Sequence, residues 1–218
     1  MKEKYFTLRS IHSQSQKICQ EAKSIFRRPM IFPEDKKTVF VVIDMQEYFL
    51  SPESHAFIPS ALAIIEEIRL FQKFCHQKKI PVIFTRHINS KQDTGLMRSW
   101  WKELIIEDNP LSRISPEFHT EGSLIIRKTQ YDAFYRTDLD HILKKQNIRY
   151  IVFSGVMTNL CCETTARSAF VRGFQPYLPV DLCAAYNEQL HRNSIMNLAV
   201  GFCPPVVAHE LKDHMEKW

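Results

Sequence analysis

The chain has 218 residues, enough to bury a large core, and a single globular unit is the expected domain count. No apolar stretch approaches the roughly 20 residues that span a bilayer, and the opening MKEKYFTLRS lacks the features of a secretory signal. We therefore expect a cytoplasmic protein without a membrane span, in which the six cysteines are free thiols. The sequence contains no CxxC pair, the spacing that would indicate a structural zinc site.

The net charge of +5 is concentrated at the N-terminus. Residues 1–37 carry nine Lys or Arg and four Asp or Glu, whereas the remainder carries twenty of each sign. The balanced body gives no electrostatic support to nucleic-acid binding, and we expect none. Residues 1–36 are predicted to be a basic extension with a helix at 14–26, and residues 37–218 the functional domain. We expect the extension to be a solvated helix that packs on the body or on a second subunit and is dispensable for folding.

From residue 38 onward, wholly apolar strands alternate with helices. The predicted strands lie at 38–44, 80–85, 123–127, 149–154, 175–180 and 205–208. The predicted helices lie at 60–79, 138–146, 161–172 and 188–202, and residues 88–120 form a long irregular insert. Strands that are apolar throughout and separated by helices indicate an α/β fold, with a parallel sheet covered on both faces.

Polar or reactive side chains stand where successive predicted strands end. Asp44 ends the first, Arg86 and His87 the second, Lys128 the third, and Cys161 lies just past the fourth. Ligand sites in such sheets form at the carboxyl ends of strands, near the point where strand order reverses. Each residue alone also fits a plainer role, such as a helix cap or a solvated charge. Lone charges are rare beside a buried sheet unless they are paired, so the set together predicts a site.

Cys161 is predicted to lie between a buried strand and a helix. Helical spacing of small and apolar residues begins there, after the break at Ser154-Gly155. Unpaired amide groups and the helix dipole at such a position favour thiolate, the reactive form. The alternative is a buried structural cysteine, because free cysteine is among the most buried residue types.

Four segments, at residues 44–49, 128–134, 155–167 and 180–185, resemble the isochorismatase-like cysteine hydrolases, and the resemblance extends over residues 38–210. It implies a Rossmann-like three-layer α/β/α sandwich with a mostly parallel central sheet, assembled as a homodimer or larger homo-oligomer. It also implies that Asp44, Lys128 and Cys161 are catalytic. Cys161 would attack a carbonyl carbon to form a thioester, and Asp44 would carry the proton. The backbone N–H groups of Met157 and Cys161 would form the oxyanion hole, with a cis peptide at Val156–Met157.

The resemblance also bears on metal and substrate. Nicotinamidase-like members bind a metal through an Asp and His residues after the first two strands. Here the first loop offers His55 but no Asp, and the second strand ends without the Asp-Trp-His pattern, so no metal and no cofactor are expected. The expected substrate contacts are apolar walls from Phe49, Trp100 and Trp101, together with Arg86. For Arg86, binding of a substrate carboxylate and a structural salt bridge are both open.

Three functions remain open from the sequence. The leading hypothesis is a metal-independent cysteine hydrolase that cleaves an amide, or an ester, of a small molecule. The second is a vinyl ether hydrolase, because residues 44–49 and 95–101 are similar to true isochorismatases. Those enzymes use the Asp as a general acid and lack the cysteine, which this chain keeps. The third is a catalytically idle member that binds a metabolite or a partner protein.

Overall fold

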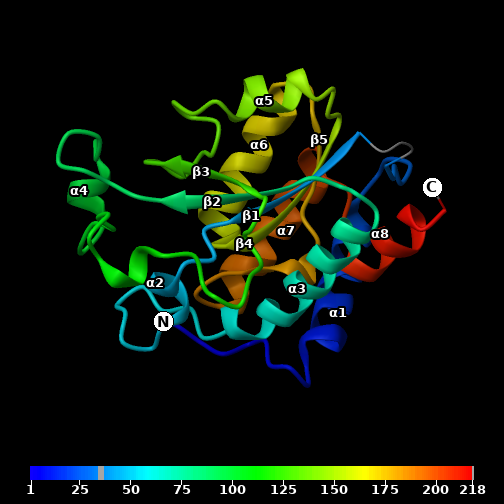
Figure 1. The fold of residues 1–218 in the computed structure, drawn as a ribbon. Coiled ribbons are helices and arrows are strands. Elements are labelled where there is room, and N and C mark those ends of the chain that lie inside the picture. Colours follow the sequence, from blue (N-terminus) through cyan, green and yellow to red (C-terminus); the bar gives the residue numbers. More distant parts are fainter. Residues whose placement is uncertain (34–36, 218) are drawn as a thin grey trace.

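The protein, seen here in a computed structural model that describes residues 1–33 and 37–217, is built on a central parallel sheet. Within those ranges the strands are β1 Thr38–Ile43, β2 Val82–His87, β3 Leu124–Lys128, β4 Tyr150–Val156, β5 Gln175–Tyr177 and β6 Cys183–Ala184. Their order is β3-β2-β1-β4-β5, with β6 also paired to β4, and every pairing is parallel. Helices cover both faces, so the predicted three-layer α/β/α sandwich is confirmed (Figure 1).

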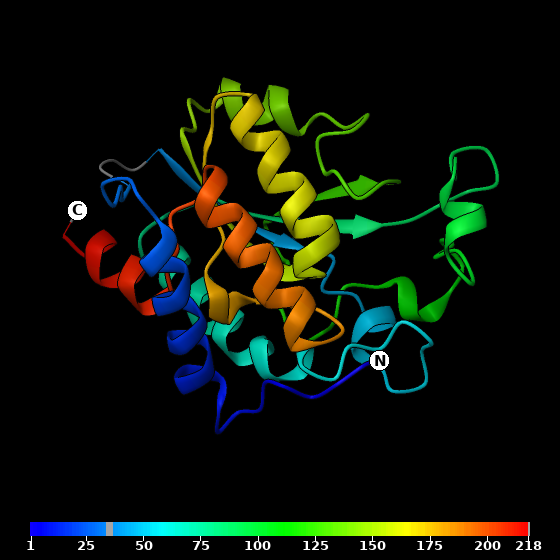
Figure 2. The ribbon, with the colours of Figure 1, turned by 180° about the vertical axis from the view of Figure 1, so that it is seen from behind.

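The helices of the described residues are α1 Ile11–Ile25, α2 Glu47–Leu50, α3 Ala61–Gln77, α4 Met97–Trp100, α5 Leu139–Lys145, α6 Glu163–Val171, α7 Glu188–Gly201 and α8 Ala208–Met215. Helix α3 packs against β1, β2 and β4 on one face, with α8 beside it. Helices α5 and α6 cover the other face, and α7 lies beside α6 (Figure 2). None of the described helices combines the length and the apolar character needed to cross a membrane.

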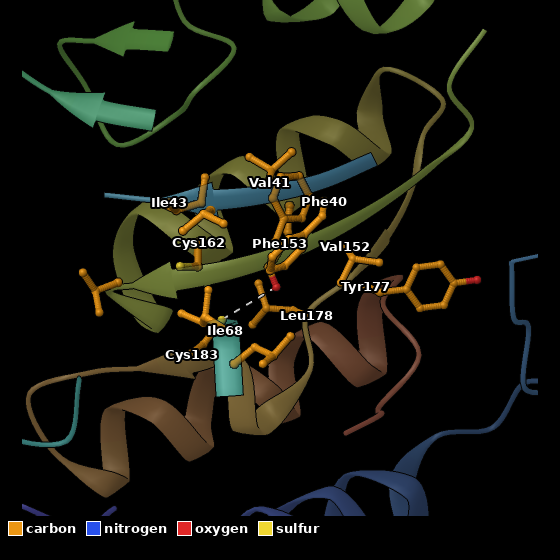
Figure 3. Close-up of a cluster of buried hydrophobic side chains, with 14 of the residues drawn as sticks. Phe40, Val41, Ile43, Ile68, Val152, Phe153, Cys162, Tyr177, Leu178 and Cys183 are labelled. Carbon is orange, nitrogen blue, oxygen red and sulfur yellow. Dashed lines mark hydrogen bonds between the residues drawn. The ribbon is translucent and has the colours of Figure 1, made fainter. Parts of the chain in front are cut away.

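The hydrophobic core is centred on β1 and β4, whose residues are all buried. Both faces of these strands are covered by helices, which explains their unbroken apolar sequence. Figure 3 shows Phe40 and Val41 of β1 packed with Phe153 of β4. Cys162 and Cys183 belong to the same fully buried cluster. Cys162 is therefore a packing residue and not a second nucleophile.

The predicted strand at 205–208 is wrong. This segment follows Pro204 and includes Pro205, and proline lacks the N–H that a sheet ladder needs. The carbonyl of Val206 instead accepts a hydrogen bond from the Val180 N–H at 3.0 Å. Helix α8 begins at Ala208, whose N–H donates to the Asp181 carboxylate at 2.8 Å. The other predicted elements exist with shifted ends, except that the strand predicted at 175–180 stops at Tyr177.

The N-terminal segment, defined here as residues 1–26, is part of the core. Helix α1 packs along α7, and the N-terminus itself lies beside α2 (Figures 1 and 2). The Phe6 and Ile18 side chains are buried, and the Tyr5 hydroxyl accepts a hydrogen bond from the Ala185 N–H at 2.9 Å. Because this segment supplies core side chains, we predict that folding requires it, in contrast to the expectation from the sequence. The predicted boundary at residue 36 lies outside the described residues.

Gly155 lets β4 pass close to the end of β1. Its φ is +106°, and a Cβ added there would lie 2.0 Å from the carbonyl oxygen of Ile43, its register partner in β1. Both atoms in the clash are held by the sheet, so neither can move away cheaply. Gly155 therefore keeps the first residue after β1, Asp44, in place.

We expect Gly155→Ala to lower the free energy of unfolding by about 4 kcal/mol or more, or to prevent folding. Gly173→Ala is the matched control, because Gly173 also has a positive φ, +89°, but no atom within 4 Å of an added Cβ. The control should show only the backbone strain, roughly 1–2 kcal/mol. Urea unfolding followed by circular dichroism measures both, and equal losses would show that the Ile43 contact does not matter.

Candidate active site

The carboxyl ends of four neighbouring strands bring the predicted residues to one edge of the sheet. Asp44 follows β1, His87 ends β2 and Lys128 ends β3, while Cys161 lies in a π-helical turn, Thr158–Cys162, after β4. β1 and β4 are neighbours at the centre of the sheet, where the strand order reverses direction. This is where ligand sites form in open parallel sheets. The structure thus brings Asp44, Lys128 and Cys161 together.

Asp44 and Lys128 form a buried ion pair. The Lys128 Nζ lies 2.7 Å from Asp44 Oδ2, and both side chains are fully buried. The Thr85 hydroxyl donates to Asp44 Oδ1 at 2.6 Å and accepts from the Asp44 N–H at 3.1 Å. These bonds hold the carboxylate in one orientation. The Lys128 charge and the Thr85 hydroxyl together offset the cost of burying this carboxylate.

The Lys128 ammonium links the acid to the thiol. Besides Asp44 it contacts the Gln130 carbonyl at 2.9 Å, His87 Nδ1 at 3.3 Å and Cys161 Sγ at 3.4 Å. Burial acts to lower the pKa of Lys128, but Asp44 and Cys161 raise it above its ordinary value. The group therefore stays an ammonium ion, positioned to stabilise negative charge on either the carboxylate or the sulfur.

His87 is a neutral hydrogen-bond acceptor for Lys128. Burial, and then the nearby Lys128 charge, lowers the pKa of His87 to about 4. The ammonium donates to Nδ1, so the proton is on Nε2, which donates to Asn89 Oδ1 at 2.9 Å. The Asn89 amide in turn donates to the Thr129 carbonyl at 3.0 Å. This chain of bonds fixes the imidazole and, through it, the ammonium.

Cys161 carries its proton in the free protein. Its side chain is only 5% exposed, and burial raises the pKa of the thiol, against the lowering influence of Lys128. The negative charge of Asp44 raises the pKa further. The expectation that a helix start lowers this pKa is therefore wrong. Helix α6 begins only at Glu163, and Cys161 lies within the preceding π turn, four residues past Met157.

The peptide between Val156 and Met157 is cis, as the resemblance implied. It connects the end of β4 to the π turn that carries Cys161. The Met157 carbonyl accepts hydrogen bonds from the Leu160 and Cys162 N–H groups, at 3.0 and 3.2 Å. Met157 thus anchors the turn and also borders the pocket described next.

A pocket lies beside the predicted catalytic residues, and Cys161 is part of its wall. The space it encloses, including the open mouth, is about 410 Å³. The walls are mostly aromatic and aliphatic, and the lining residues are Tyr48, Phe49, His87, Asn89, Trp101, Glu103, Leu104, Ile105, Tyr131, Met157 and Cys161. Phe49 and Trp101 therefore lie where the sequence predicted them, and the Trp101 Nε1–H donates to the Tyr131 hydroxyl at 3.1 Å.

Arg86 and Trp100 do not line this pocket, in contrast to the prediction. Arg86 is adjacent to His87 on β2, and successive residues of a strand point to opposite faces. Its guanidinium bonds to the Ser112 carbonyl and hydroxyl and to Glu107, which is the structural salt bridge that the sequence left open. Trp100 ends the single-turn helix α4 and is 81% exposed, because the turn directs Trp101 inward instead.

Sequence reasoning missed several pocket residues. Tyr48 and Tyr131 lie inside the segments that carried the family resemblance, which was the available signal. Glu103 lies in the irregular insert at 88–120, where no sequence pattern marked it as a pocket residue. The Tyr48 hydroxyl donates to Glu103 Oε1 at 2.8 Å and lies 2.7 Å from His55 Nε2. These three residues form a hydrogen-bonded group at the pocket mouth, which we call the mouth triad.

The donor set at this site does not fit a metal ion. His87 has both ring nitrogens in hydrogen bonds, one of them to an ammonium that would repel a cation. His55 Nε2 is bonded within the mouth triad. In residues 1–33 and 37–217, the only grouping of three potential ligands is His12, Glu67 and Asp181, none of which lines the pocket. No chemical step is therefore assigned to a metal.

Acid should destabilise the protein through its buried histidines. His87 and His191 have pKa values lowered by burial to about 4 and about 3, against an ordinary 6.5. As the pH falls below 6.5, the unfolded state therefore binds two protons that the native state does not. Burial raises the pKa of Asp181 to about 6, so below pH 6 it takes up one proton first in the native state and offsets one histidine. His55, whose pKa is also lowered, adds to the loss.

We expect the free energy of unfolding to fall by about 1.4 kcal/mol per pH unit between pH 6 and pH 4, which corresponds to one net proton. Urea unfolding at fixed pH values measures this slope. In His191→Asn the slope should become nearly flat, because His87 and Asp181 then balance. An unchanged slope in that variant would show that His191 is not the cause.

Comparison with known proteins places this geometry in a family. Residues 38–210 match the family model of the Isochorismatase domain. Nicotinamidase 3 of Arabidopsis thaliana is 36% identical over 185 residues, covering 83% of this chain and 89% of that protein. Enterobactin synthase component B of Escherichia coli is 26% identical over 172 residues, covering 76% of this chain and 59% of that one.

A solved cysteine hydrolase from Pseudomonas syringae pv. phaseolicola superposes with a TM-score of 0.83 at 25% identity, over 88% of this chain and 99% of that one. The chain belongs to the isochorismatase-like hydrolase family.

Proposed function

We propose that this protein is a cysteine hydrolase that cleaves an amide bond of a small molecule through a thioester, without a metal. The observation that carries the proposal is the buried contact set in which one ammonium, of Lys128, lies 2.7 Å from Asp44 Oδ2 and 3.4 Å from Cys161 Sγ. Two opposite charges and a thiol are costly to bury without a use, and Cys161 lines the pocket. This argues against a catalytically idle member.

The proposed first half-reaction forms the thioester. The thiol proton of Cys161 passes to Asp44, and the Lys128 ammonium contacts both the carboxylate and the sulfur. The sulfur attacks the amide carbonyl carbon, and the backbone N–H groups of Met157 and Cys161 receive the oxyanion. Asp44 then gives the proton to the leaving nitrogen, and the C–N bond breaks to release an amine or ammonia. The Lys128 ammonium stabilises the negative charge both on the Asp44 carboxylate and on the Cys161 sulfur.

The second half-reaction releases the acid. Asp44, again a carboxylate, removes a proton from a water molecule that attacks the thioester carbon. The tetrahedral intermediate collapses, the C–S bond breaks, and the proton returns from Asp44 to the sulfur. The raised pKa of the Cys161 thiol fits this cycle, because the resting form is the protonated one and Asp44 serves as base and acid in turn. An ester substrate follows the same steps with an alcohol as the leaving group.

A panel of small primary amides and matched esters tests the proposal. We expect release of ammonia from at least one amide, and a rapid-quench intact mass increased by the acyl group, located on the peptide that contains Cys161. Activity should survive incubation with a chelator and its removal. Turnover without any acyl adduct, or activity that is lost on chelation and restored by one added metal, would contradict the proposed mechanism.

A further inference from the structure

The charge balance of the pocket distinguishes among substrates. Lys128 and Asp44 neutralise each other, and His87 and the Cys161 thiol are uncharged. Among the residues that line the pocket, Glu103 is the one that carries a net charge, which is negative. Among the residues that the structure describes, no lysine or arginine lines the pocket. The residues that line the pocket therefore sum to one negative charge, on Glu103, while Lys2 and Lys102 lie near His55 without lining the pocket.

Glu103 is held in place but not neutralised. Its partners in the mouth triad are the Tyr48 hydroxyl and the His55 imidazole. His55 has a pKa lowered by burial, so at neutral pH it is an uncharged partner. In the part of the chain that the structure describes, no lysine or arginine lies within ion-pair distance of Glu103. Its side chain is 55% exposed, which leaves carboxylate surface for a ligand.

Aromatic rings line the pocket beside this carboxylate. Tyr48 and Phe49 come from α2, Trp101 follows α4, and Tyr131 follows β3. The Trp101 Nε1–H to Tyr131 hydroxyl bond fixes two of these rings. Ring faces attract cations, and a carboxylate beside them adds direct charge attraction. The same arrangement repels a carboxylate, which would gain nothing from the rings and would meet Glu103.

We infer that the substrates are amides that carry a cationic group, such as a quaternary or protonated amine, at the end remote from the scissile bond. The inference rests on the proposed function in placing the amide carbonyl at Cys161. The cation then lies toward Glu103, with the aliphatic or aromatic body of the substrate between Phe49 and Trp101. Glu103 is a specificity-determining residue, and it takes no part in the covalent steps.

Three amides of similar size and different charge test the inference: 4-(trimethylammonio)butanamide, its uncharged isostere 5,5-dimethylhexanamide, and the anionic 4-carboxybutanamide. Dissociation constants are measured by calorimetry on Cys161→Ala, which binds without chemistry, and kcat/KM is measured on the wild-type protein. We expect the cationic amide to bind about tenfold more tightly than its isostere, and the anion at least tenfold more weakly.

Glu103→Gln in the Cys161→Ala background should reduce the preference for cation over isostere to about twofold. Glu107→Gln is the matched control: Glu107 is nearby and exposed but lies outside the pocket lining, so the preference should persist. Equal binding of cation and isostere, a preference for the anion, or an unchanged ratio in Glu103→Gln would each overturn the inference. If the preference holds in binding while the wild-type protein hydrolyses no amide, the inference stands and the proposed function fails.

Discussion

Cys161→Ala should lower kcat/KM for the amide substrate by at least ~1000-fold, while the variant keeps its fold and binds the substrate. Neither Asp44 nor Lys128 can supply the covalent bond, and residual rates after removal of a nucleophile come only from binding and the oxyanion hole. The pocket wall is otherwise retained, because alanine removes only the sulfur. Cys162→Ala is the control, since Cys162 lies next in the chain but in the core (Figure 3). It should lower stability and retain turnover.

The same variants distinguish the cysteine hydrolase hypothesis from the vinyl ether hydrolase hypothesis. Vinyl ether hydrolysis requires only proton transfer from Asp44 and an open pocket, so Cys161→Ala or Cys161→Gly would then remain active. Asp44→Asn should be inactive under both mechanisms, because it removes the proton carrier next to Lys128. If Cys161→Ala turns over the substrate that the panel identifies at a rate comparable to wild type, the cysteine mechanism is refuted. The vinyl ether hydrolase hypothesis is then favoured.

A chain that begins at residue 37 should not fold. The N-terminal segment buries Tyr5, Phe6, Ile11 and Ile18, at roughly 1.5–3 kcal/mol each. These four side chains together are worth about as much as the entire 5–15 kcal/mol stability of a typical domain. Their loss also uncovers His191, whose ring contacts those of Tyr5 and Phe6. Expression of the shortened chain should therefore give insoluble protein, or soluble protein without a cooperative unfolding transition.

Point variants in the full-length chain test the same claim without a deletion. Phe6→Ala should lower the free energy of unfolding by about 3–5 kcal/mol, because Phe6 is fully buried. Leu8→Ala, two residues away, should change it by no more than about 0.5 kcal/mol, because Leu8 is 71% exposed. Two results would show that the N-terminal segment is dispensable for folding. One is a soluble, cooperatively folded chain from residue 37, and the other is an equal loss of unfolding free energy in Phe6→Ala and Leu8→Ala.

The parallel sheet was predictable from the sequence because wholly buried strands have a simple signature. β1 and β4 are apolar throughout, and helices separate them from their neighbours. The carboxyl ends of parallel strands lie at one edge, so a proximity of Asp44, Lys128 and Cys161 followed from chain order alone. Local patterns failed where neither periodicity nor turn chemistry decided the structure. The segment at 205–208 has the composition of a strand but joins no sheet, because Pro204, Pro205 and the start of α8 prevent pairing.

Only the tertiary structure decided what surrounds these residues. Packing between segments far apart in the chain directs Arg86 away from the pocket. The same packing buries Cys161, which raises its pKa, and places Glu103 in the pocket wall. The N-terminal segment likewise reads as a charged extension, yet its few apolar residues meet α7 and complete the core. Sequence determines which groups stand at strand ends through local periodicity. Their solvation, charge state and partners come from long-range contacts, which no local pattern encodes.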